Sequence, residues 1–266
     1  MLKIAWFTDI HLEFLNSNQR TSFCKEMAET KPDVVLIGGD ISTAPKFTTH
    51  LLMVEEQLEC PIYFVLGNHD FYGGSITKMR QTAKKISDSS RQLHWLTNSG
   101  IVKLTENSAL IGHGSWADGR LGNGPRSEVL LNDYFYIEEF LGLSEKARFA
   151  KLNQLGDEAA AYFKHFLPKA CHRFKNLLLL THVPPFRESC WHEGAISDNE
   201  FLPHFSCQAV GEVLLDVMQA YPQCHLTVLC GHTHSSGEAQ ILPNLYVKTG
   251  SAIYGSPYLQ ELIIVE

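Results

Sequence analysis

Short apolar runs rich in β-branched residues alternate with helix-like segments along the first third of the chain. We predict strands at 4–7, 34–37 and 62–66 and helices at 22–29, 47–58 and 75–86. This β-α-β-α-β-α order predicts a largely parallel sheet with helices on its faces.

The remaining two thirds of the chain continue the mixed pattern. We expect a helical region at 144–167, interrupted at Gly156, and strands at 101–104, 109–111, 177–180, 226–229, 245–248 and 259–265. No internal repeat, low-complexity tract or long linker divides the sequence. We therefore predict one domain over residues 1–266, of the α/β class with an added strand-rich end.

The composition excludes several classes of protein. Of the 266 residues, 44% are hydrophobic and 19% are charged, which is typical of globular proteins and excludes disorder as the main state. The net charge of -7, without a long basic run, disfavours general binding to nucleic acids or anionic membranes. No apolar stretch is long enough to predict a membrane span. The sequence carries no signal for an oligomeric state.

Cysteine usage and the first residues bear on the compartment. Seven scattered cysteines without a C-x-x-C pair argue against a disulfide framework or a structural zinc site. Asp9 and His11 interrupt the first apolar run before it reaches the length of a signal-peptide core, so we interpret the run as a strand. Both observations favour a cytoplasmic protein.

Five apolar runs are each followed at once by residues that bind metal ions. In order along the chain they read IAWF-TDIH, VVLI-GGD, IYFVL-GNHD, LLLL-TH and LTVLC-GHTH. Ligands of open α/β sheets gather beyond the carboxyl ends of the strands, so these distant segments are expected to meet there. Glycine at Gly39, Gly67 and Gly231 would allow sharp turns and a close approach of the backbone to a ligand.

Seven side chains in these segments are candidate metal ligands: Asp9, His11, Asp40, Asn68, His182, His232 and His234. Carboxylate, amide and imidazole groups without thiolate suit Mn, Fe, Zn or Co better than a structural zinc site. Because one ion offers only about four to six positions, we predict two metals that share a carboxylate. Two such ions activate a water molecule and neutralise the charge that builds at phosphorus, which predicts phosphoester hydrolysis.

The ordered blocks D-x-H, GGD, GNHD, a lone H and GHTH resemble those of the calcineurin-like metallophosphoesterase superfamily, over residues 9–234. The resemblance implies two mixed β-sheets packed as a sandwich and flanked by helices. It implies one metal held by Asp9, His11, Asp40 and His234, and a second held by Asp40, Asn68, His182 and His232, with Asp40 bridging. It also implies that His69 is a catalytic histidine beside the phosphate, which donates a proton to the leaving group or stabilises the transition state.

One position departs from the family pattern. Many members carry an aspartate three residues after the bridging aspartate, where it orients the catalytic histidine, and Thr43 stands at that position here. The sequence therefore offers no partner for His69. The blocks GDISTAPKF and GNHD also lack the arginine and the final glutamate of the phosphoprotein phosphatases, and are closer to bacterial-type phosphoesterases and metal-dependent cyclic nucleotide phosphodiesterases.

Context assigns three further features. Asp70 is expected to stabilise a turn and is left out of the site. His113, after an apolar run and a glycine, is predicted to contact substrate, with an ordinary loop histidine as the alternative. Residues 191–194 are candidates for a rim or lid over the metals.

The leading hypothesis is a dinuclear-metal-dependent hydrolase of phosphate monoesters or diesters, with a metal-bridging hydroxide as the nucleophile. Its partner would be a small phosphoester, for which a nucleotide is one candidate. The alternative is a specific phosphodiesterase for cyclic nucleotides or nucleotide pyrophosphates. A non-catalytic scaffold of the same fold is disfavoured because His69 and all seven candidate ligands are present. No sequence rule selects the metal or the leaving group.

Overall fold

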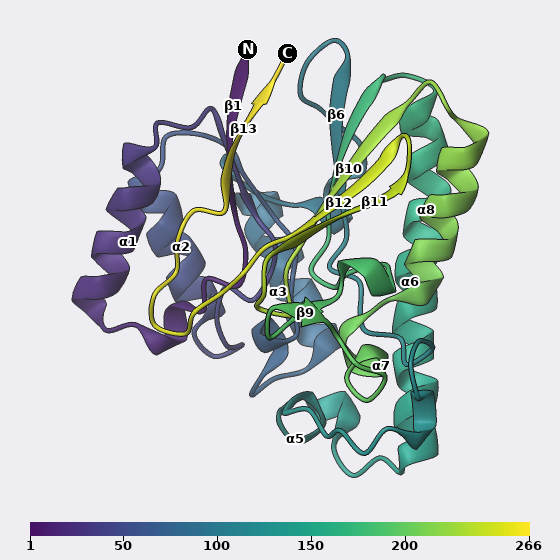
Figure 1. The fold of residues 1–266 in the computed structure, drawn as a ribbon. Coiled ribbons are helices and arrows are strands. Elements are labelled where there is room, and N and C mark those ends of the chain that lie inside the picture. The colour runs from purple at the N-terminus through teal and green to yellow at the C-terminus, as the bar shows by residue number, and fades with distance from the viewer.

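Two mixed β-sheets form the centre of the molecule in the computed structural model, which describes residues 1–266 (Figure 1). The first sheet has the strand order β13-β1-β2-β3-β4, with β1 (Leu2–Phe7), β2 (Val34–Ile37), β3 (Ile62–Phe64), β4 (Leu93–Trp95) and β13 (Glu261–Val265). The second has the order β11-β12-β10-β7-β6-β5, with β5 (Val102–Lys103), β6 (Ser108–Gly112), β7 (Asn176–Leu180), β10 (His225–Cys230), β11 (Gly237–Leu242) and β12 (Leu245–Thr249). The predicted fold class, α/β with two mixed sheets in a sandwich, is confirmed.

The central strands of both sheets are parallel. In the first sheet β1 to β4 run in one direction, as the β-α-β pattern predicts, and β13 is antiparallel beside β1. In the second, β12, β10, β7 and β6 are parallel, and the edge strands β11 and β5 are antiparallel. Because Leu2 pairs with Val265, the two chain termini lie side by side where β1 begins, and the carboxyl end of β1 faces the opposite side of the molecule (Figure 1).

Helices cover the outer face of each sheet (Figure 1). The first sheet carries α1 (Ser17–Glu29), α2 (Phe47–Gln57) and α3 (Ile76–Ser89), and the second carries α6 (Glu145–Cys171) and α8 (Gln208–Ala220). Helix α3 illustrates why the helices pack on the sheets, since it has one apolar face. The residues of that face recur at helical spacing and are all buried: Ile76, Met79, Ala83 and Ile86. The Ser75 hydroxyl accepts a hydrogen bond from the Lys78 N–H and so caps this helix.

Alternation along the strands builds a core on both faces of the first sheet. Ala5 and Phe7 of β1 pack toward the helices, whereas Ile4 and Trp6 pack between the two sheets. The inter-sheet layer is completed by apolar side chains of both sheets, including Leu36, Leu110, Leu180 and Leu229. Each sheet is therefore buried on both sides, which explains why its parallel strands are continuous apolar runs in the sequence.

Short helices, short strands and single helical turns lie in the segments that connect the main elements. The short helices are α4 (Leu96–Ser99), α5 (Asp133–Tyr136) and α7 (Leu202–Phe205), and β8 (Trp191–His192) and β9 (Ala195–Ile196) form a small hairpin. Single turns of 3-10 helix include η1 (Leu12–Phe14) and η2 (His69–Phe71). No helix combines the length and the apolar character needed to cross a bilayer.

The structure corrects the predicted interruption at Gly156. Helix α6 runs unbroken from Glu145 to Cys171, and a Cβ at position 156 would lie 2.5 Å from the Cβ of Asp118. The glycine therefore makes room for the loop that carries Asp118, and does not end the helix. The elements β4, β11 and α8 are not among those predicted from the sequence, and neither are the short elements α4, α5, α7, β8 and β9.

Candidate metal centre

All seven predicted ligands lie together at the carboxyl ends of β1, β2, β3, β7 and β10. Asp9, His11, Asp40 and His234 form one group, whose ligand atoms lie within 4.8 Å of one another. Asn68, His182 and His232 form a second group, in which His182 Nε2 and His232 Nδ1 each lie 3.0 Å from Asn68 Oδ1. Segments more than 200 residues apart in the sequence thus meet at one place.

The Asp40 carboxylate lies between the two groups. Its Oδ2 is 3.7 Å from His11 Nε2 in the first group, and its Oδ1 is 3.5 Å from His182 Nε2 in the second. Oδ1 also accepts a hydrogen bond from the backbone N–H of His69 at 2.8 Å. This placement is the one that a bridging carboxylate requires.

Backbone strain is concentrated at the same residues. Eight non-glycine residues in the chain have a positive φ, and five of them are candidate ligands: Asp9, His11, Asp40, His232 and His234. Left-handed conformations cost free energy in residues with a Cβ, and such strain typically accumulates at functional sites. The fold therefore holds these side chains in place at the expense of local stability.

Two of the predicted glycines are needed for steric reasons. A Cβ at Gly67 would overlap Oδ1 of Asp40, and a Cβ at Gly231 would overlap Oδ2 of Asp9. The backbone after β3 and β10 therefore packs directly against the two carboxylates, as the pattern of glycines after strands predicts.

Gly67→Ala is accordingly expected to destabilise the protein by about 1–3 kcal/mol, the usual cost of overpacking a well-packed region, and to lower its metal content because Asp40 must shift. Chemical denaturation and elemental analysis would measure the two effects. Lys85→Ala, at an exposed position of α3 without a side-chain hydrogen bond, is the control. Normal metal content in Gly67→Ala would contradict the expectation.

Hydrogen bonds at the far side of two imidazole rings fix which nitrogen faces the centre. His182 Nδ1 donates to the Gly38 carbonyl and His232 Nε2 donates to the His204 carbonyl, each at 2.9 Å. Burial lowers the pKa of His182 to about 3 and also lowers the pKa of His232, which favours the neutral form of both rings with the one proton on the nitrogen that donates. The remaining nitrogens therefore present lone pairs to Asn68 Oδ1, which is itself an acceptor. Two ring nitrogens and one amide oxygen, all hydrogen-bond acceptors, thus lie together with no proton between them. This arrangement suits a bound cation.

The charges of the buried carboxylates also favour a bound cation. Burial and the neighbouring Asp9 and Asp70 raise the pKa of Asp40 well above its usual range. Burial also acts to raise the pKa of Asp9, but the surrounding His182, His234 and His11 outweigh it and the net shift is downward. A pair of buried carboxylates without lysine or arginine is costly unless positive charge lies between them. The donor set present here therefore fits metal cations.

Asp133, which follows no strand and was not predicted, orients one of the candidate ligands. Its Oδ1 accepts hydrogen bonds from Asn68 Nδ2 at 2.8 Å and from the Tyr72 hydroxyl at 2.6 Å. Because the amide nitrogen of Asn68 is held by Asp133, its oxygen must face His182 and His232.

We expect Asp133→Ala to weaken metal binding by the second group about 10- to 100-fold, the range seen when an outer hydrogen-bond partner of a metal ligand is removed. Binding by the first group should change less, since Asp133 contacts none of its members. Calorimetric metal titration would resolve the two steps, with Asp216→Ala at an exposed position as the control. Equal weakening of both steps would show that Asp133 does not act through Asn68.

His69 lies beside the ligand groups and belongs to neither of them. Its ring stacks on Tyr72 with centroids 4.2 Å apart, and Nδ1 lies 3.5 Å from Glu13 Oε1. Asp70 instead lies underneath: its two carboxylate oxygens accept hydrogen bonds from the backbone N–H groups of Ile41, Ser42 and Gly67. Asp70 thus ties the loop after β2 to the loop after β3, which is the structural role predicted for it.

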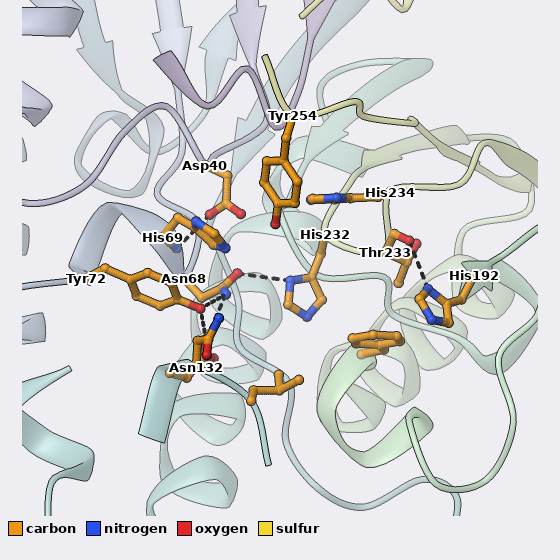
Figure 2. Close-up of a pocket in the computed structure, with 13 residues that line it drawn as sticks. Asp40, Asn68, His69, Tyr72, Asn132, His192, His232, Thr233, His234 and Tyr254 are labelled. Carbon is orange, nitrogen blue, oxygen red and sulfur yellow. Dashed lines mark hydrogen bonds between the residues drawn. The ribbon is translucent and has the colours of Figure 1, made fainter. Parts of the chain in front are cut away.

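A cavity of about 230 Å³ opens over the two groups (Figure 2). Tyr254 lies above Asp40, His69 and His234, with its ring centroid 5.0 Å from that of His234 (Figure 2). On the opposite side His192 of the β8–β9 hairpin lines the cavity, with Nδ1 3.4 Å from the Thr233 carbonyl. Of residues 191–194, which were predicted as a rim or lid, His192 is the one that lines the cavity.

The structure does not place His113 in this cavity. The residue is buried, its Nδ1 accepts a hydrogen bond from the Ser115 N–H at 2.9 Å, and its ring packs beside Tyr162 and Phe163. It lines a separate small cavity with Arg80. The predicted contact of His113 with substrate is therefore corrected: the chain turns after β6 so that this side chain packs behind the site.

Sequence reasoning missed three residues that shape the site: Glu13, Asp133 and Tyr254. Glu13 follows His11 by two positions, so its place in the same loop was a usable signal. Burial by itself raises the pKa of Glu13, but hydrogen bonds from His11 and His69 lower it to about 2, and the carboxylate is ionised. Asp133 and Tyr254 lie in long loops without any strand-end pattern, and only the folded chain brings them to the centre.

Comparisons with known proteins agree with this geometry. The family model for the calcineurin-like phosphoesterases matches residues 2–236. A probable cyclic nucleotide phosphodiesterase of Pseudoalteromonas sp. (strain SM9913) is 34% identical over 82 residues. That match covers 26% of this chain and 31% of the relative, so less than a third of the relative's length is represented.

Solved structures show the same fold at low sequence identity. A phosphopantetheinyl hydrolase from Mycobacterium tuberculosis has a TM-score of 0.65 at 12% identity, over 95% of this chain and 90% of that chain. A dimetal phosphatase from Danio rerio has a TM-score of 0.58 at 14% identity, over 96% and 89% of the two chains. These likenesses show the fold, and the family match over residues 2–236 confirms the predicted superfamily. The chain belongs to the calcineurin-like phosphoesterase family.

Proposed function

We propose that this phosphoesterase uses two metal ions, each held by one of the two groups, to hydrolyse small phosphoesters. The observation that carries the proposal is the convergence of seven ligand side chains, with the Asp40 carboxylate between the groups. The first metal would be held by Asp9, His11, Asp40 and His234, and the second by Asp40, Asn68, His182 and His232. Mn, Fe, Zn and Co all suit such a mixture of oxygen and nitrogen ligands.

In this proposal, different residues of the chain have different roles in the reaction. When bound, the cations supply an activated water molecule and neutralise the charge that builds at phosphorus. Asp40 sets the spacing of the two groups, and Asp133 holds the oxygen of Asn68 toward the second group. The ring of His69 lines the cavity, where it can hold the proton that the leaving alcohol requires.

The proposal is tested by removing all metal and reloading the protein with Mn, Fe, Zn or Co in turn. We expect two equivalents of metal per chain and hydrolysis of bis(4-nitrophenyl) phosphate that a chelator abolishes. Activity that persists in chelator, or a single bound equivalent, would contradict the two-metal proposal. Two bound metals without hydrolysis of any ester would instead favour the non-catalytic scaffold.

A more specific function, hydrolysis of phosphodiesters, is favoured by the charge of the cavity. Asp40 and Asp133 line it, whereas no lysine or arginine does. A phosphate monoester carries about 1.5 to 2 negative charges at neutral pH, and a diester carries one. The two cations alone would have to balance the extra charge of a monoester, so the cavity suits diesters better.

Aromatic rings around the cavity suit a planar group on such a diester. Tyr72, Phe205 and Tyr254 line it together with His192, and nucleobases stack on rings of this kind. The partial match to a probable cyclic nucleotide phosphodiesterase supports the same candidate. We expect kcat/KM for a cyclic nucleotide or a nucleotide pyrophosphate to exceed that for the corresponding mononucleotide; the opposite order would contradict the diester preference.

We also propose a cytoplasmic location. All seven cysteines are buried and unpaired, which supports a reducing compartment.

A further inference from the structure

The position from which the family pattern would supply an aspartate to orient the catalytic histidine is Thr43, and no hydrogen bond joins Thr43 to His69. Thr43 lies in the turn before α2, where its carbonyl accepts a hydrogen bond from the Lys46 N–H. The question of what holds His69 must therefore be answered by another part of the chain.

Glu13 occupies the space beside His69 from a different loop. It lies in η1, after β1, and its side chain is only 7% exposed. One oxygen, Oε1, is 3.5 Å from His69 Nδ1 and 3.3 Å from His11 Nδ1. The other oxygen, Oε2, is buried and has no hydrogen-bond partner, so the two imidazole rings are the side chains that this carboxylate meets.

The rest of the surroundings constrain the His69 ring to face Glu13. Tyr72 stacks on one face with centroids 4.2 Å apart, and the His11 ring meets it edge to face at 4.5 Å. The backbone N–H of His69 is held by Asp40. With Nδ1 beside a carboxylate, Nε2 is the nitrogen left without a partner in the chain, and the ring lines the cavity over the metal groups.

We propose that Glu13 is the positioning residue for His69 and takes the role that the missing aspartate has elsewhere in the family. This inference rests on the proposed function of His69. Glu13 accepts a hydrogen bond from Nδ1–H of His69, which fixes the ring so that Nε2–H faces the leaving group. A carboxylate behind a catalytic imidazole selects the tautomer and the orientation in the same way in other hydrolases. In the reaction the Nε2 proton passes to the departing alcohol oxygen as the P–O bond breaks, and the Nδ1 proton stays between His69 and Glu13.

The same carboxylate also reaches a metal ligand. By accepting from His11 Nδ1, Glu13 leaves the lone pair of His11 Nε2 directed at Asp40 and His234. One acidic side chain thus orients a ligand of the first metal and the proton donor. The competing interpretation is that His11, Glu13 and His69 themselves hold a cation, since their ligand atoms also lie within 4.8 Å of one another.

The experiment is a double-mutant cycle of Glu13→Gln and His69→Ala with two aryl methyl phosphates, one that releases 4-nitrophenol and one that releases phenol. We expect Glu13→Gln to lower kcat on the phenol ester about 10- to 100-fold, the range for loss of an outer hydrogen-bond partner of a functional histidine. The loss on the 4-nitrophenol ester should be much smaller, since that leaving group needs little protonation. In the His69→Ala background, Glu13→Gln should have almost no further effect on kcat or KM when both ligand groups are saturated with metal, a condition that is needed because Glu13 also orients His11.

Three outcomes would overturn the proposal: equal losses on both esters, an independent effect of Glu13→Gln in the His69→Ala background at saturating metal, or a third metal equivalent that the wild type binds and Glu13→Gln loses, which would favour the cation. Glu56→Gln, at an exposed position, is the matched control. If the wild type hydrolyses no ester, the proposed function fails, but ¹⁵N shifts of the His69 ring in the zinc-loaded protein still decide the positioning. A ring protonated at Nδ1 in the wild type and tautomerically mixed in Glu13→Gln would support it, and identical shifts would refute it.

Discussion

Asp40→Asn is expected to abolish tight binding of both metals and to lower kcat/KM by at least about 10³-fold, since metal ions contribute several kcal/mol of transition-state stabilisation. Asparagine keeps the shape of the side chain, and its oxygen can still accept the hydrogen bond from the His69 N–H. The change therefore removes the negative charge that lies between His11 and His182 while it preserves the local structure.

Elemental analysis after gel filtration, together with steady-state kinetics, measures the two effects. Asp216→Asn, at an exposed position with no hydrogen bond, is the control. Loss of only one metal equivalent would mean that Asp40 belongs to one group, and wild-type metal content and activity would remove it from the centre.

His69→Ala is expected to keep both metals and to lower kcat by about 10²- to 10⁴-fold on esters with poor leaving groups, the range for loss of a general acid or base. Metal content should persist because the ring contacts Glu13 and Tyr72, and the candidate ligand atoms lie on other residues. Esters of 4-nitrophenol, whose departure needs little protonation, should lose much less activity.

Kinetics with the two classes of ester would check this expectation, and His165→Ala on the exposed face of α6 serves as the control. Full kcat on a poor leaving group would rule out the acid role for His69. Loss of a metal equivalent would instead assign His69 to the ligands.

Much of the fold could be predicted from the sequence because the parallel strands are buried on both faces. Strands such as β2 and β7 are therefore unbroken apolar runs, and the abrupt change to Asp, Asn and His marks their carboxyl ends. The strand β11 was missed for the complementary reason. It is an edge strand with half-exposed and exposed residues, and its sequence GEAQIL carries no apolar run. The predicted interruption of helix α6 was wrong because packing against Asp118 requires a glycine at position 156. Local helix propensity cannot reveal such a contact.

The candidate ligands could be predicted because each follows its strand within a few residues, so topology alone determines where they meet. Their neighbours could not. His113 satisfies the same local pattern, yet the turn after β6 buries it beside Tyr162. Asp133 and Tyr254 lie in loops whose paths depend on packing between distant segments, and sequence spacing carries no information about such paths.

The sequence by itself determined the α/β class, the family and the set of side chains that can hold metal ions, because strand ends and ligand types are local properties of the chain. Only the tertiary structure decided that Glu13 lies beside His69, that Asp133 holds Asn68 and that Tyr254 and His192 line the cavity. These relations depend on distances of a few ångström between residues that lie far apart in the sequence or in separate loops, and such distances are fixed only when the whole chain is folded.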